Sequence, residues 1–132
     1  MKVSINLFFI LIFACISNSC SSLLDDGSNT LVKENANGKL SKKAVLFLRE
    51  AGSTVADSYQ VSIVDYKTKF DTSAVGNVFT VDSDHGKANL NPKAITFNWL
   101  SNDTLEIRYD KNLRTFIQKE RIDGVTIVYK LN

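Results

Sequence analysis

Cysteine is nearly absent from this chain of 132 residues, which has only Cys15 and Cys20. Beyond position 20 there is no thiol, so that part of the chain forms no internal disulfide and offers no cysteine nucleophile. A small domain without such a covalent cross-link depends on its hydrophobic core for stability. This absence excludes a disulfide-stapled scaffold and a cysteine-dependent enzyme for the region after residue 20.

Groups for acid–base and nucleophilic catalysis are also scarce. The chain has one histidine, His85, and no G-x-S-x-G motif of the kind that places a catalytic serine on a sharp turn. General acid–base catalysis needs two converging carboxylates with separated pKa values, and no spacing in the sequence identifies such a pair. We therefore predict a protein that is not an enzyme and needs no cofactor.

Positive and negative charges are nearly balanced in this chain. Sixteen Lys and Arg residues face fourteen Asp and Glu residues, for a net charge of +2. Removing residues 1–19 takes away one lysine and lowers the net charge to +1. Nucleic-acid binding requires a clustered basic surface, so the balance argues against a nucleic-acid partner.

The first twenty residues have the pattern of an export signal. Lys2 precedes an apolar run over residues 3–16, and small or polar residues follow at 17–19. A charged start, a short apolar stretch and a small-residue exit are typical of a signal peptide. The run is also shorter than the roughly 20 residues that a membrane-spanning helix needs. We predict a signal peptide over residues 1–19.

This segment resembles the signal of bacterial lipoproteins, in which a loose aliphatic-small-small-Cys box precedes the lipidated cysteine. Residues 17–20 (SNSC) lack the aliphatic residue but follow a full-length apolar core. Residues 12–15 (IFAC) match the aliphatic position but leave a core of only about ten residues. Cleavage at Cys15 would also leave Cys20 unpaired in an oxidising compartment. We favour Cys20 as the lipidated residue and keep Cys15 as the alternative. The resemblance further implies palmitate-type acylation and, because a serine follows Cys20, anchoring in the outer membrane.

Two regions follow the signal. Residues 20–36 are rich in Ser, Asp and Asn and are predicted to form the lipidated cysteine and a flexible tether. Residues 37–132 are predicted to form one β domain, because apolar residues alternate with period two and no segment has sustained helical periodicity. The fold expected is all-β, a single small antiparallel meander of six to seven strands that closes as a sandwich or a half-barrel. The predicted strands cover residues 44–49, 59–66, 76–81, 95–99, 105–109, 116–121 and 125–131.

Turn residues separate several of these strands. Asp123-Gly124 predicts a type I′ hairpin, and Asn37-Gly38 and Asn102-Asp103 predict tight turns. Strands that alternate in this way imply one buried and one wet face of the sheet. On the wet face, Tyr66 and Phe70 are candidates for a recognition patch.

One cluster of potentially reactive side chains stands out, Asp82-Ser83-Asp84-His85-Gly86. A polar turn is the favoured interpretation: an aspartate caps backbone N–H groups, His85 bonds a carbonyl and Gly86 takes positive φ. A second interpretation is a binding loop that uses Asp82, Asp84 and His85. The third is a metal or catalytic site, since Asp and His are metal ligands; however, no Glu completes a calcium loop, and no further His or nearby Cys completes a zinc site.

The order of motifs along residues 37–130 is similar to a family of small bacterial envelope lipoprotein domains of unknown function. The segments that carry the likeness are KAVLF-x-R-E-x-G, YQVSIV, GNVF-x-x-D-x-DHG, WL-x-x-x-TL-x-I-x-Y and DGV-x-I-x-Y. Residues 76–86 (GNVFTVDSDHG) are the most specific part. The resemblance implies one β domain behind a lipoprotein signal and implies no activity.

Together these patterns predict a lipid-anchored protein of the bacterial cell envelope that acts as a binding module. Its expected partners are the membrane, through the N-terminal lipid, and a protein or another envelope component. An inhibitor or immunity-type role is the most specific version. The alternative is a periplasmic metal-binding protein or hydrolase that uses the loop of Asp82, Asp84 and His85.

The lipid anchor can be tested by metabolic labelling with a clickable fatty acid. We expect Cys20→Ala to abolish labelling of the protein and Cys15→Ala to leave it unchanged, because only the cysteine at the cleavage site receives the acyl chains. Loss of label in Cys15→Ala alone would reverse the assignment of the two cysteines.

Overall fold

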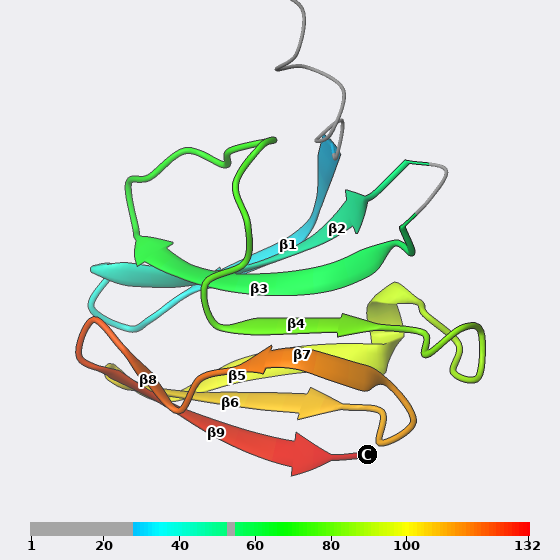
Figure 1. Ribbon diagram of the computed structural model, residues 1–132. Helices are drawn as coiled ribbons and strands as arrows, with labels where there is room; N and C mark the ends of the chain where they lie inside the picture. Colours follow the sequence, from blue (N-terminus) through cyan, green and yellow to red (C-terminus); the bar gives the residue numbers. More distant parts are fainter. Residues whose placement is uncertain (1–27, 53–54) are drawn as a thin grey trace, which may run out of the picture.

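The computed structural model describes residues 28–52 and 55–132, and this part of the chain folds into two packed β-sheets (Figure 1). The sheet of five strands has the order β1-β2-β3-β4-β7, and the sheet of four strands has the order β5-β6-β9-β8. The elements are β1 (Ser28–Ala36), β2 (Lys42–Glu50), β3 (Ser58–Asp65), β4 (Phe79–Asp82), the 3₁₀ turn η2 (Pro92–Ala94), β5 (Ile95–Ser101), β6 (Thr104–Tyr109), β7 (Arg114–Gln118), β8 (Arg121–Ile122) and β9 (Val125–Leu131). The predicted all-β sandwich is confirmed, and the sheets do not close into a barrel.

The main core lies between the two sheets, as the alternation predicts. The five-stranded sheet contributes side chains such as Leu46, Val61 and Phe79, all at most 1% exposed. Phe79 packs against two rings of the other sheet, with centroid distances of 4.9 Å to Tyr109 and 5.4 Å to Tyr129. Burying such apolar and aromatic surface is the dominant stabilising contribution for a domain without disulfides.

The chain does not run as the simple meander expected. After β6 it leaves the four-stranded sheet, adds β7 to the five-stranded sheet beside β4, and returns as β8 and β9. Because of this excursion β9 enters beside β6 in the same direction, and the pair is parallel whereas the other strand pairs are antiparallel. The predicted strand over residues 116–121 corresponds to β7 and the short β8.

The tether predicted for residues 20–36 ends earlier than expected. Ser28–Ala36 form β1, which pairs with β2 from Ser28 opposite Glu50 to Ala36 opposite Lys43. The polar composition that suggested a tether is that of an edge strand, which leaves most of its side chains in solvent. The predicted signal peptide and both cysteines lie outside the described residues.

The five-stranded sheet is covered on its outer face as well. In β2 the five residues from Lys43 to Phe47 are all buried, so Val45 and Phe47, which face away from the main core, also need a cover. Residues 66–78, named here the cover segment, arch over this face between β3 and β4 (Figure 1). Phe70 packs on Phe47 with ring centroids 5.8 Å apart. The outer face of the sheet, expected from the sequence to be in solvent, is therefore covered over β2 and β3 by the cover segment.

Hydrogen bonds tie the cover segment to the sheet. Asn29 of β1 donates through Nδ2 to the carbonyl oxygens of Asp71 (3.2 Å) and Ala74 (2.6 Å). Arg49, which is 9% exposed, donates through Nη1 to the carbonyl of Ser73 at 3.3 Å. Asn77 exchanges two bonds of 2.9 Å with the backbone of Ile63. The cover segment is thus held on the sheet by hydrogen bonds at several points.

The predicted turns are present. Asp123 and Gly124 both have positive φ, 46° and 80°, as a type I′ hairpin requires. Asn37 is 1% exposed, and its Nδ2 donates to the carbonyl of Asn102 at 2.8 Å. This bond joins the β1–β2 turn to the β5–β6 turn, so it connects the two sheets at one end.

Gly76 is where the cover segment approaches the sheet most tightly. A Cβ at this position would lie 2.7 Å from Cβ of Gln60, and the Gly76 amide donates to Oε1 of Gln60 at 2.6 Å. We expect Gly76→Ala to lower the free energy of unfolding by about 1–3 kcal/mol, because the overpacked segment must shift. Urea denaturation measures the change. Val75→Ala, at a neighbour that is 58% exposed, is the control and is expected to stay within about 0.5 kcal/mol of the wild type.

Candidate binding recess around Arg114

The predicted loop residues lie beside a recess on the outer face of the five-stranded sheet. Side chains alternate between the two faces of β4. Phe79 and Val81 point into the main core, so Thr80 and Asp82 face outward. The recess has a volume of about 430 Å³. Its lining comes from the chain before β3, from β3, β4 and β7 and from the loop after β4: Val55, Ala56, Ser58, Thr80, Asp82, His85, Arg114 and Phe116.

Asp82 is held by Arg114 across the β4–β7 pairing, in which the two residues are direct partners. The guanidinium donates from Nε to Oδ1 at 3.1 Å and from Nη2 to Oδ2, a bidentate arrangement. Burial, which leaves Asp82 3% exposed, by itself raises the pKa of this carboxyl. The opposing hydrogen bonds from Arg114 and from the Asp84 amide, with the nearby positive charge, outweigh burial and hold the pKa of Asp82 below its usual value.

The turn after β4 has the geometry predicted for a polar turn, with one exception. The Asp84 amide donates to Oδ1 of Asp82 at 2.8 Å, and Gly86 has φ of 83°. Asp84 and His85 also have positive φ, 48° and 59°. The exception is His85, whose Nε2 lies 3.1 Å from Nη1 of Arg114 instead of bonding a carbonyl. Since a guanidinium can only donate, Nε2 of His85 is the acceptor in this contact.

Arg114 therefore brings the three predicted residues together. Besides Asp82 and His85 it approaches Asp84, whose Oδ1 lies 4.0 Å from Nη1. Arg114 was not among the residues predicted from the sequence, because it lies 32 residues after Asp82 and meets it only through the return of the chain to the five-stranded sheet. Arg114 can be identified only when the strand pairing and its register are known.

A metal site is not assembled here. Within residues 28–52 and 55–132, no group of three His, Cys, Asp or Glu side chains is placed to hold a metal ion. Both oxygens of Asp82 are engaged by Arg114, so coordination by this carboxylate would require the ion pair to open.

The floor of the recess contains an unsatisfied polar group. Thr80 is 8% exposed, and its Oγ1 has no hydrogen-bond partner in the described structure. Leaving a buried hydroxyl unpaired costs about 1–3 kcal/mol. A group that enters the recess and bonds this hydroxyl would remove the penalty.

The rim is apolar and exposed. A bulge between Thr80 and Val81 gives β7 an extra residue opposite β4, and Phe116 beside it is 57% exposed. The Arg114 guanidinium carbon lies 4.7 Å from the centroid of the Phe116 ring, which keeps the ring in place by a cation–π contact. Val55, 65% exposed, lines the same recess. Arginine and aromatic side chains are enriched in the interfaces that proteins form with one another.

Comparison with protein-family models, with curated proteins and with solved structures finds no match. Among the described residues, no helix has the length and apolarity needed to cross a membrane.

The Asp82–Arg114 pair makes the free energy of unfolding of the domain depend on pH. We expect Asp82→Asn to lower the free energy of unfolding at pH 7 by about 1–3 kcal/mol, because charge-assisted hydrogen bonds become neutral ones. The folded-state pKa of Asp82 lies below the value of about 3.9 for an unfolded chain. The contribution of the pair is therefore complete above about pH 5 and is lost as the pH falls below about 4.

Urea denaturation of both proteins between pH 3 and pH 7 measures this dependence. Asp110→Asn is the matched control, since its side chain keeps an oxygen to accept from the Asn112 amide. A difference between wild type and Asp82→Asn that is the same at pH 3 and pH 7 would show that the ion pair is not its cause.

Proposed function

We propose that this protein is a lipid-anchored binding module of the bacterial envelope that holds a protein partner at the Arg114 recess. The observation that carries the proposal is the buried Thr80 hydroxyl, unpartnered in the described structure, beneath the exposed rim of Phe116. A partner side chain seated in the recess covers the exposed ring and, once the Thr80 side chain turns toward it, gives that hydroxyl a hydrogen bond. Both changes favour the bound state.

The electrostatics of the recess also favour a protein partner. Arg114 has five N–H donors, of which Asp82 takes two and His85 one. The remaining donors are available to a carbonyl or carboxylate of the partner. Because Asp82 and Arg114 neutralise one another, the recess selects for shape and hydrogen-bond pattern rather than for high charge.

The anchor proposed for this module is a lipid on Cys20, with Cys15 as the alternative, behind a signal peptide over residues 1–19. Each buried methylene of an acyl chain contributes roughly 0.8 kcal/mol, so two or three chains hold the protein at the bilayer. The outer membrane is the proposed location, with the domain facing the periplasm or the cell surface. The lipoprotein pattern of the first twenty residues supports this part of the proposal.

Within this class we propose an inhibitor or immunity-type role. A small rigid sandwich blocks another protein by occupying its surface and needs no catalytic groups for that task. The Arg114–Phe116 pair supplies an arginine and an aromatic ring held against one another, and both residue types are enriched at protein interfaces.

Site-specific photocrosslinking tests the partner surface. With p-benzoylphenylalanine in place of Phe116 in the full chain, produced in living bacteria, we expect one discrete crosslinked adduct. The matched control places the same probe at Val128, which is 36% exposed on the four-stranded sheet and alternates with core residues. Equal adducts from both positions, or none from position 116, would contradict the proposal.

Thr80→Val separates binding from folding in the same experiment. Valine has the shape of threonine without the hydroxyl, so the free protein is expected to be as stable as the wild type or slightly more stable. The adduct from position 116 is expected to weaken severalfold, since the bond to the partner is lost. A weaker adduct together with a destabilised domain would point to a structural role of Thr80 instead.

A further inference from the structure

A second cavity lies under the cover segment, on the same sheet but apart from the Arg114 recess. Its volume is about 180 Å³, and its walls come from β2, β3 and the cover segment. The hydrogen bonds from Asn29, Arg49 and Asn77 described above hold the roof in place, and the Phe47–Phe70 contact closes one side. The cavity is therefore preformed, which lowers the entropic cost of binding.

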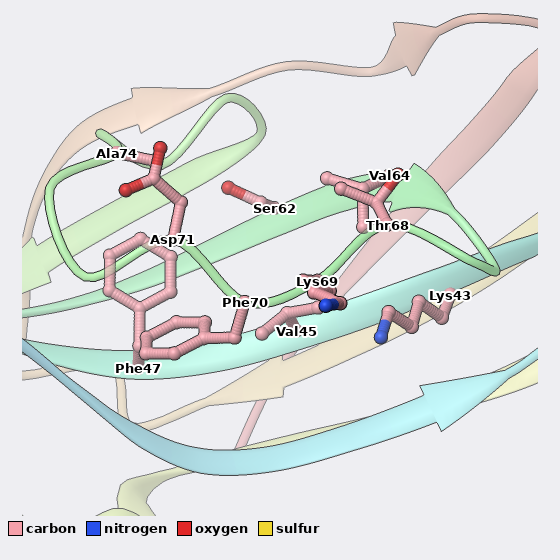
Figure 2. A pocket seen from close by; sticks show the side chains of 10 residues that line it. All are labelled: Lys43, Val45, Phe47, Ser62, Val64, Thr68, Lys69, Phe70, Asp71 and Ala74. Carbon is pink, nitrogen blue, oxygen red and sulfur yellow. The ribbon is translucent and has the colours of Figure 1, made fainter.

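The walls are mostly apolar. Val45, Phe47, Val64 and Phe70 line the cavity, and Figure 2 shows the two aromatic rings side by side at one end. A cavity of about 150 Å³ with such walls takes up a molecule the size of benzene. This space therefore suits an apolar group of about four to eight carbon atoms.

The other end of the cavity is cationic. The ammonium groups of Lys43 and Lys69 lie toward that end in Figure 2. Lys43 donates to Oε2 of Glu34 at 3.0 Å. Lys69 has no hydrogen bond or ion pair with any residue of the described structure. A positive charge without a partner at the mouth of an apolar cavity favours an anionic head group.

Two polar side chains fix the orientation of such a ligand. Ser62 is 7% exposed and accepts from the Asn77 amide at 3.2 Å, which leaves its own O–H free to donate. Asp71 lies away from the two lysines in Figure 2, and its carboxylate is already bonded by the Ser73 amide and hydroxyl at 2.8 and 2.7 Å. An anionic head group is therefore attracted to the lysine end and repelled from the other.

We propose that this cavity binds a small monocarboxylate with an apolar tail, the carboxylate at Lys69 and the tail between Val45 and the two phenylalanine rings. Lys69 supplies a charge-assisted hydrogen bond, and the apolar walls bury the tail. The site does not depend on the protein partner proposed for the Arg114 recess. Occupation also stiffens the cover segment, because the ligand fills the space beneath it.

Fluorine NMR of the full chain tests this site. The protein is labelled with fluorophenylalanine and held in phosphatidylcholine nanodiscs, and the Phe70 signal is assigned with Phe70→Leu. We expect hexanoate to shift that signal saturably. Hexanol is expected to bind at least about fivefold more weakly than hexanoate, because hexanol lacks the charge. Equal binding of the two probes, or no saturable shift with hexanoate, would overturn the proposal.

Two variants locate the ligand. Lys69→Met keeps the length of the side chain without its charge, and we expect it to weaken hexanoate binding about fivefold while leaving hexanol unchanged. Lys67→Met is the matched control, since Lys67 is exposed and does not line the cavity. Ala74→Leu fills the cavity from the cover segment and is expected to abolish both shifts. Wild-type hexanoate affinity in Lys69→Met, or equal losses in both lysine variants, would place the anion elsewhere.

Discussion

Strand β2 is apolar on both of its faces, and much of the architecture follows from that constraint. Ala44 and Leu46 enter the core between the sheets, whereas Val45 and Phe47 point the other way and are equally buried. A two-layer sandwich covers only one face of each sheet, so the second face of β2 needs a third layer. The cover segment is that layer, and the cavity beneath it exists because an irregular segment fills the space less completely than a sheet does.

The Arg114 recess follows from a different constraint, the path of the chain. Because the chain leaves the four-stranded sheet after β6 and places β7 beside β4, Asp82 gains a partner that its own neighbours in sequence do not supply. A buried carboxylate requires such a partner, since an unpaired charge at that depth is costly. The outward-facing side chains of β4 therefore form an ion pair beside an open recess. The outward-facing side chains of β2 and β3 lie beneath the cover segment instead.

Local patterns in the sequence predicted most strands and several turns. Alternation located β5, β6 and β9, and Asp123-Gly124 located the final hairpin, because both signals depend on neighbouring residues alone. Strand β1 was missed because an edge strand in solvent has the composition of a tether. Phe70, expected in a wet patch, instead covers Phe47. The role of Arg114 and the position of the cover segment depend on pairings between distant residues, which a single sequence does not reveal.

With the proposed lipid on Cys20, the start of β1 would set how far the recess lies from the membrane. Along one end of the five-stranded sheet, Ser28 pairs with Glu50, Ser58 with Asp82, and Asp82 with Arg114. Ser28 lies eight positions after Cys20, and a chain of eight residue steps reaches at most about 29 Å when fully extended. Such a segment would keep the Arg114 end of the domain close to the bilayer. A partner would then have to meet it in the narrow layer next to the lipid headgroups, which selects proteins that are themselves held at that membrane.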